Sequence, residues 1–67
     1  MVQKVTEVVG SSTQGFAAAA KNAVETAAKT VRNLRWFRVV ELEGQIKDQK
    51  VSEYKATVKI YFDLDDH

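Results

Sequence analysis

The chain has 67 residues and a formal net charge of +1, and it contains no Cys and no Pro. A chain of this size buries only roughly 60% of its unfolded surface, and without Cys it has neither a disulfide nor a thiolate metal site to add stability. There is no apolar run of the roughly 20 residues that span a bilayer, and no signal-peptide pattern. We therefore expect one domain, residues 1–67, in a cytoplasmic protein that has no membrane partner and gains stability by self-association.

The N-terminal residues predict a strand followed by the start of a helix. Residues 2–9 mix Val and Thr with polar side chains and end at Gly10, as a short strand before a turn does. Ser11 and Gln14 then have the spacing of a capping box at a helix N-terminus. Two glycines lie in this segment, but Phe16 follows them in place of the Lys-Ser/Thr pair of a phosphate-binding loop. The plain capping interpretation is therefore favoured over a nucleotide site.

The next segment has the pattern of an amphipathic helix. Apolar residues recur at three- and four-residue steps from Phe16 to Leu34, which is the period of one helical face. We expect a helix over residues 16–33. Most of its apolar face is Ala, so this helix can approach a sheet closely but contributes little apolar area. No cofactor site is expected on it, because alanine side chains offer no chemistry.

The C-terminal half predicts two long strands joined by a hairpin. Even positions from Tyr54 to Leu64 are apolar and most odd positions are polar, which indicates a strand with one face in the core. Residues 47–50 are all polar and form the expected hairpin turn. In the preceding strand the apolar positions change from odd to even, and a slip of one residue near Val40 and Glu41 predicts a β-bulge.

These elements predict an α+β fold in the order strand, helix, strand, strand. A strand–helix–strand crossover makes the first two strands parallel, and the hairpin makes the third antiparallel to its neighbour. The strongly patterned third strand is placed in the centre, and the three-stranded antiparallel sheet wraps around the one helix. The open sheet edges and overhanging strand ends need partners, which again favours a homo-oligomer.

The only Trp lies in the segment Arg35-Trp36-Phe37-Arg38. The apolar pattern predicts that Phe37 faces the helix and serves the core, so that Trp36 and Arg38 face the opposite side of the sheet, and Lys55 lies on that far side too. Trp36 then either packs into a subunit interface, forms a platform for a flat ligand, or stacks on nucleic-acid bases. The residues alone favour the interface, and the near-neutral charge argues against nucleic acid.

The sequence offers no support for catalysis. The only His is His67, which lies beside Asp63, Asp65 and Asp66 and is expected to belong to a solvated acidic tail and not to a metal site. No paired carboxylates or Ser/His/Asp set can be placed convincingly. We therefore expect a protein that is not an enzyme and that has no catalytic or metal-binding residues.

At the level of its motifs, the sequence resembles the dodecin family along nearly its whole length. The order and spacing of several motifs together make this resemblance specific. The matching segments are residues 8–12 (Val-Val-Gly-Ser-Ser), 29–34 (Lys-Thr-Val-Arg-Asn-Leu), 35–39 (Arg-Trp-Phe-Arg-Val), 43–46 (Glu-Gly-Gln-Ile) and 53–64. The resemblance implies a single dodecin-like domain with a βαββ subunit, assembled as a hollow homododecamer.

The resemblance also implies a function in flavin binding. Flavins (FMN, riboflavin or FAD) would be held as stacked pairs between symmetry-related Trp36 side chains, which would quench their photochemistry. Proteins of this family are regarded as flavin storage or buffering proteins and not as enzymes. Some bacterial members similar to this chain also bind coenzyme A.

Carried over residue by residue, the resemblance implies four cofactor-binding positions. Trp36 occupies the stacking position, Arg38 lies on the same face, and Gln45 matches a position that lines the pocket. Lys55 is a departure, because flavin-binding members typically carry Gln there, and Lys offers only hydrogen-bond donors where Gln offers a donor and an acceptor. An alternative is therefore a dodecameric structural shell, or one for another ligand such as coenzyme A, with weak or lost flavin binding.

Overall fold

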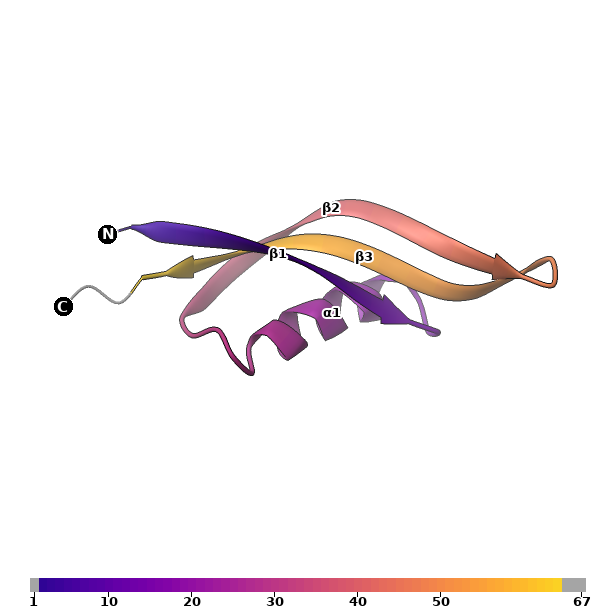
Figure 1. The fold of residues 1–67 in the computed structure, drawn as a ribbon, viewed down its shortest axis with the longest axis horizontal. Helices are drawn as coiled ribbons and strands as arrows, with labels where there is room; N and C mark the ends of the chain where they lie inside the picture. The colour runs from indigo at the N-terminus through magenta and orange to yellow at the C-terminus, as the bar shows by residue number, and fades with distance from the viewer. Residues whose placement is uncertain (1, 65–67) are drawn as a thin grey trace.

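The computed structural model describes residues 2–64. Its elements, in chain order, are β1 (Gln3–Ser12), α1 (Phe16–Ala27), β2 (Leu34–Lys47) and β3 (Lys50–Asp63). The three strands form one sheet in the order β1-β3-β2, and α1 lies across one face of it (Figure 1). Both outer strands pair antiparallel with β3. The predicted α+β topology, with the last strand in the centre, is confirmed.

The core is small and lies between α1 and the middle of β3. Alternation along β3 turns Ala56, Val58 and Ile60 toward the helix, and all three are at most 1% exposed. The helix contributes only alanines to the buried set, namely Ala19, Ala20, Ala23 and Ala27. Val58 and Ile60 are the only large side chains among the described residues that are fully buried. A core of this size supplies little apolar burial to offset the ordering of the chain.

Gly10 allows the helix backbone to approach the sheet. It pairs with Ala56 on β3, directly beneath α1. A Cβ atom at Gly10 would lie 2.2 Å from the carbonyl oxygen of Ala19 and 2.7 Å from the Cβ of Ala23. The space that a side chain would need is therefore taken by the helix. The alanine face of α1 and this glycine together set the short distance between the two layers.

The helix begins later than the capping pattern predicts. Ser11 and Ser12 belong to β1, where they pair with β3, and the residue before the helix is Gly15, with a φ of 150° and no side-chain cap. The hydroxyl of Ser12 accepts a hydrogen bond of 2.9 Å from the backbone N–H of Gln14 within the connecting turn. The predicted capping box of Ser11 and Gln14 is wrong, because pairing with β3 extends the first strand through the serines.

The helix also ends earlier than predicted, at Ala27 and not at residue 33. A turn follows, and Asn33 has a φ of 63°, which redirects the chain into β2. Leu34 packs against the core as the first residue of β2 and not as part of the helix. The fit of Leu34 to the helical period is therefore coincidental, and counting Leu34 in that period made the predicted helix too long.

The bulge and the hairpin turn are confirmed. The register of β2 against β3 shifts between Val39 and Glu41, so Val40 is the extra residue. The hairpin loop consists of Asp48 and Gln49, with φ values of 54° and 64°. Two successive residues with positive φ are typical of a type I′ hairpin turn, here without the usual Asn-Gly sequence.

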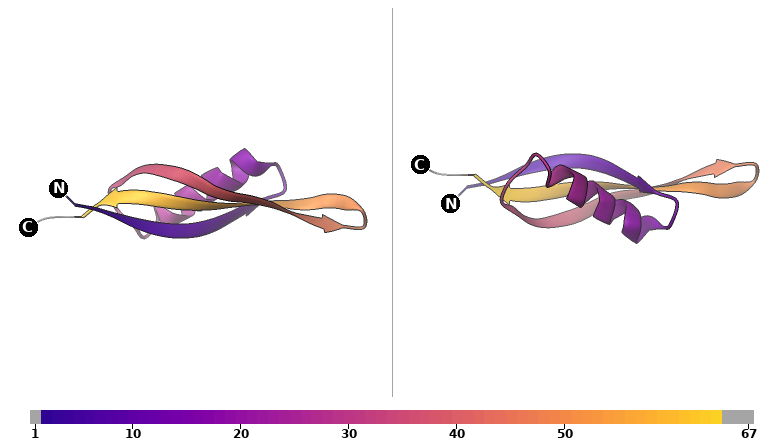
Figure 2. Two further views of the ribbon diagram at one scale, coloured as in Figure 1. Left: turned by 90° about the horizontal axis from the view of Figure 1, so that it is seen from above. Right: turned by 90° about the horizontal axis from the view of Figure 1, so that it is seen from below.

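The helix covers β1 and β3 and leaves most of β2 open, as the view from below shows (Figure 2). Phe37 pairs with Ile60 and so lies on the helix side, as predicted. However, Phe37 is 46% exposed and Val39 is 42% exposed. The expectation that Phe37 serves the core of the subunit is therefore wrong. Both side chains instead line an open apolar hollow of about 400 Å³ beside Ala20 and Val24 of α1.

None of the helices in the described part of the chain is both long and apolar enough to cross a membrane.

We predict that Gly10→Ala destabilises the protein by about 1–3 kcal/mol, because the new methyl group overlaps the helix backbone. The midpoint of thermal unfolding, measured at matched protein concentration, should fall. Gly44→Ala is the control, because a Cβ atom there meets only the carbonyl oxygen of Glu53, at 3.7 Å. An unchanged midpoint for Gly10→Ala would contradict the close approach of α1 to β1.

Candidate functional site

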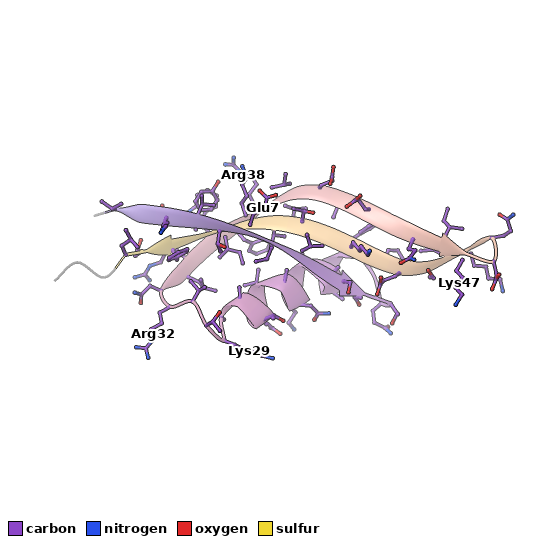
Figure 3. The ribbon with its side chains drawn as sticks, in the orientation of Figure 1. Glu7, Lys29, Arg32, Arg38 and Lys47 are labelled. Atoms are coloured by element: carbon purple, nitrogen blue, oxygen red, sulfur yellow. The ribbon has the colours of Figure 1, made fainter. Side chains whose placement is uncertain are left out.

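The face of the sheet that points away from α1 carries the predicted ligand-binding residues. We call this surface the far face. Trp36 pairs with Tyr61, and Arg38 pairs with Lys59, so these side chains alternate with the helix-facing residues of β3. Arg38 and Glu7 project from the side of the sheet opposite to α1, whereas Lys29 and Arg32 follow the helix (Figure 3). The predicted orientation of Trp36 and Arg38 is confirmed by this register.

Trp36 is stacked on Tyr61. The two ring centroids are 3.8 Å apart and the ring planes are inclined by only 5°. The Cζ atom of Arg38 lies 5.5 Å from the centre of the indole ring, within the range of a cation–π interaction. Trp36 is nevertheless 44% exposed. The indole is therefore held in a defined orientation while much of its surface stays open.

Tyr61 was not singled out by the sequence analysis. The alternation of β3 places it on the polar face, but its partner on β2 depends on the register. That register shifts between Leu34 and Trp36 and again after Val39. A bulge cannot be located to the residue from an apolar pattern alone, so the pair of aromatic rings became visible only in three dimensions.

Next to Trp36, Asp63 joins the ends of all three strands. Its Oδ2 atom lies 2.6 Å from the Nε of Arg35 on β2, and its Oδ1 accepts a hydrogen bond of 3.2 Å from the side-chain amide of Gln3 on β1. The backbone N–H of Asp63 donates to the carbonyl oxygen of Asn33 at 3.1 Å. The hydrogen bond from Arg35, followed by that from Gln3, lowers the pKa of Asp63.

The other two predicted site residues lie far from Trp36 within the same chain. Lys55 pairs with Glu43, six residues along β3 from Tyr61, which corresponds to roughly 20 Å at about 3.3 Å per residue. Gln45 lies farther toward the hairpin. Within one chain, Trp36 lies beside Arg38, and Lys55 lies close to Gln45. These two pairs of residues are separated along the strands. An isoalloxazine ring that stacks on Trp36 therefore does not reach Lys55 of the same chain.

Many large apolar side chains are exposed on the isolated subunit. They occur on both faces of the sheet and on the hairpin that extends beyond β1 (Figure 1). The set comprises Val2, Val5, Val9, Phe16, Trp36, Phe37, Val39, Val40, Leu42, Ile46, Val51 and Leu64. Exposed large apolar side chains in this number, on a subunit with so small a core, indicate surfaces that are covered by association with other copies.

Within residues 2–64, no group of three or more His, Cys, Asp or Glu side chains is placed to hold a metal ion. Of the predicted solvated acidic tail, Asp65, Asp66 and His67 lie outside the described residues. The prediction is wrong for Asp63, which is buried and held by Arg35 and Gln3.

The comparisons with known proteins agree with the geometry. The family model that describes dodecin matches residues 2–65. The chain belongs to the dodecin family. It is 40% identical to the dodecin of Thermus thermophilus over 65 residues, which is 97% of this chain and 94% of that protein.

Solved structures give the same result for the fold. The dodecin from Streptomyces davaonensis superimposes with a TM-score of 0.94 at 38% identity, covering 97% of this chain and 96% of the other. The dodecin from Streptomyces coelicolor superimposes with a TM-score of 0.93 at 41% identity, covering 98% of this chain and 94% of the other. Dodecins are small binding proteins that assemble as dodecamers and, as a family, bind flavins.

We predict that acid destabilises this protein partly through Asp63. Its pKa in the folded state lies below the ordinary value of 3.8, so the ionised carboxylate favours folding above that pH. This contribution is lost as the pH falls from about 4 through the lowered pKa. Unfolding midpoints measured from pH 6 downward should therefore fall less steeply for Asp63→Asn than for the wild type.

Asp48→Asn, at the hairpin tip, is the matched control for this experiment because it removes a carboxyl group remote from Arg35 and Gln3. It should keep the wild-type acid profile. An Asp63→Asn variant with the wild-type profile would show that the contacts with Arg35 and Gln3 do not stabilise the charged form of Asp63.

Proposed function

We propose that this protein is a flavin-sequestering dodecamer in which Trp36 is the platform on which the isoalloxazine ring stacks. The observation that carries this proposal is the half-exposed indole on the far face, held parallel to Tyr61 in a chain of the dodecin family. An indole and an isoalloxazine both present large polarisable faces, and stacking removes both from water. Pairs of flavins would lie between Trp36 side chains of symmetry-related subunits.

Assembly completes the pocket in this proposal. Twelve copies of a 7.5 kDa chain give a particle of about 90 kDa, and their contacts would cover the exposed apolar residues. Lys55 and Gln45 lie roughly 20 Å or more from Trp36 within one chain, so a neighbouring subunit must supply them to the same flavin. The Cζ atom of Arg38 of the same subunit lies over the Trp36 ring, 5.5 Å from its centre. Its guanidinium would turn aside when a flavin stacks there and could then bind a flavin carbonyl or phosphate.

The proposed role is storage and protection of the ligand and not catalysis. Stacking places an electron-rich indole in contact with the flavin, so that an excited flavin can accept an electron from Trp36 and return it. This cycle dissipates the excitation without net chemistry. A flavin enclosed in this way is quenched and is shielded from photochemical damage.

Lys55 sets the hydrogen bonding at the polar edge of the flavin in this proposal. An ammonium group donates to a flavin carbonyl or phosphate but accepts nothing. The ring N–H is then left without the acceptor that a glutamine would provide, at a cost of roughly 1–3 kcal/mol. Lys55 also favours a second candidate, a dodecameric shell that binds another anionic cofactor such as coenzyme A and holds flavin weakly.

We predict that FMN loses its fluorescence on titration with the wild-type protein and that Trp36→Ala abolishes most of this quenching, because the stacking surface is removed. Fluorescence titration measures both effects. The native mass of each variant should be about 90 kDa. Unquenched FMN in the presence of assembled wild-type protein would contradict flavin sequestration and favour the second candidate.

We also predict that Lys55→Gln tightens riboflavin binding by roughly tenfold, because the amide supplies the missing acceptor. The dissociation constant from the same titration is the measurement. Lys29→Gln removes a positive charge from the turn that follows α1 and should leave affinity unchanged. Equal or weaker riboflavin binding by Lys55→Gln would exclude Lys55 from the ring edge.

A further inference from the structure

Tyr61 occupies the middle of a row of side chains that crosses the far face. Val5 on β1, Tyr61 on β3 and Trp36 on β2 share one register position. The Trp36 and Tyr61 rings are nearly parallel at 3.8 Å, which is closer than the roughly 4.5–7 Å usual for aromatic pairs. The phenol ring of Tyr61 therefore covers the face of the indole that points toward the central strand, β3.

The position of Tyr61 decides which face of Trp36 a ligand can use. β3 is the central strand and β2 is an edge strand, so the indole face toward β3 is the one that Tyr61 covers. The opposite face looks toward the free edge of β2, where this chain has no further strand. A flat ligand can stack on Trp36 only from that face, and the guanidinium of Arg38, whose Cζ lies over the ring 5.5 Å from its centre, must turn aside to admit it.

The stack also restrains the side chain of Trp36 before any ligand arrives. A half-exposed Trp without such a neighbour can change its side-chain torsions, and a ligand must then bear the entropic cost of ordering it. Val5 flanks Tyr61 on β1, and Asp63 ties the strand ends two residues farther along β3. The support for the indole thus comes from all three strands.

We propose that Tyr61 is a positioning residue that backs Trp36, fixes the plane of the indole and confines flavin stacking to the outer face. This inference rests on the proposed flavin-binding function, in which the flavin ring adds a third layer to a stack of two. Tyr61 acts through Trp36 and does not contact the ligand. The aromatic face of Tyr61 carries this role, and its hydroxyl group does not.

Two substitutions of Tyr61 in the assembled protein distinguish the effect of its planar aromatic face from that of its apolar volume. Tyr61→Phe keeps the aromatic face and removes the hydroxyl, whereas Tyr61→Leu keeps an apolar side chain and removes the planar face. Trp36 is the only Trp in the chain, so time-resolved fluorescence anisotropy of the ligand-free protein reports on this indole alone. Titration with FMN gives the dissociation constant of each variant, and native mass confirms assembly.

We expect Tyr61→Phe to match the wild type in both measurements. Tyr61→Leu should show a new fast component of indole rotation and bind FMN roughly three- to tenfold more weakly. Unchanged anisotropy in Tyr61→Leu would refute the positioning role. Equal or tighter FMN binding would show that Tyr61 does not support the ligand-bound state, and tighter binding would mean that it competes with the flavin.

The experiment also separates this inference from the proposed function. If the wild-type protein fails to bind FMN, flavin sequestration fails, while the anisotropy still decides whether Tyr61 orders Trp36. If Trp36→Ala abolishes binding but Tyr61→Leu does not weaken it, only the inference fails. Should Tyr61→Leu not assemble, Tyr61→Met provides the same comparison with a flexible apolar side chain.

Discussion

The close approach of α1 to the sheet is the constraint on which the rest of this structure depends. Gly10 leaves room for the helix backbone at Ala19, and an alanine face meets the buried side of β3. Two layers that pack this closely enclose few large side chains, so the subunit has little core of its own. The apolar surface left on β2 and the hairpin then makes association with other copies part of folding.

The same arrangement leaves the far face free for ligand binding. One helix covers one side of the sheet, and the other side displays Trp36, Arg38 and Lys55 along strands of 14 residues each. Because these strands are long, Trp36 and Lys55 are separated within a chain, and in the proposed function they meet between chains. Assembly and the proposed ligand binding would therefore both result from the same geometry.

The alternation of apolar residues and the hairpin were sufficient to predict the topology, the central position of β3, a bulge near Val40 and Glu41, and the side of the sheet that bears Trp36. The capping box was wrong because pairing with β3 extends β1 through the serines. The C-terminal limit of the helix was wrong because Leu34 fits the helical period yet packs from β2. The Trp36–Tyr61 stack could not be predicted, since it depends on a register that shifts at three places along β2. The hypothesis that the ligand is a flavin came from the resemblance to dodecins, because hydrophobic periodicity does not identify a ligand.

The most direct test of this account is a crystal structure of the assembled protein grown with FMN. The account predicts an isoalloxazine ring parallel to the Trp36 indole, on the face opposite to Tyr61, with Lys55 of a different subunit at the polar edge of the ring. A flavin bound away from Trp36, or inserted between Trp36 and Tyr61, would contradict it.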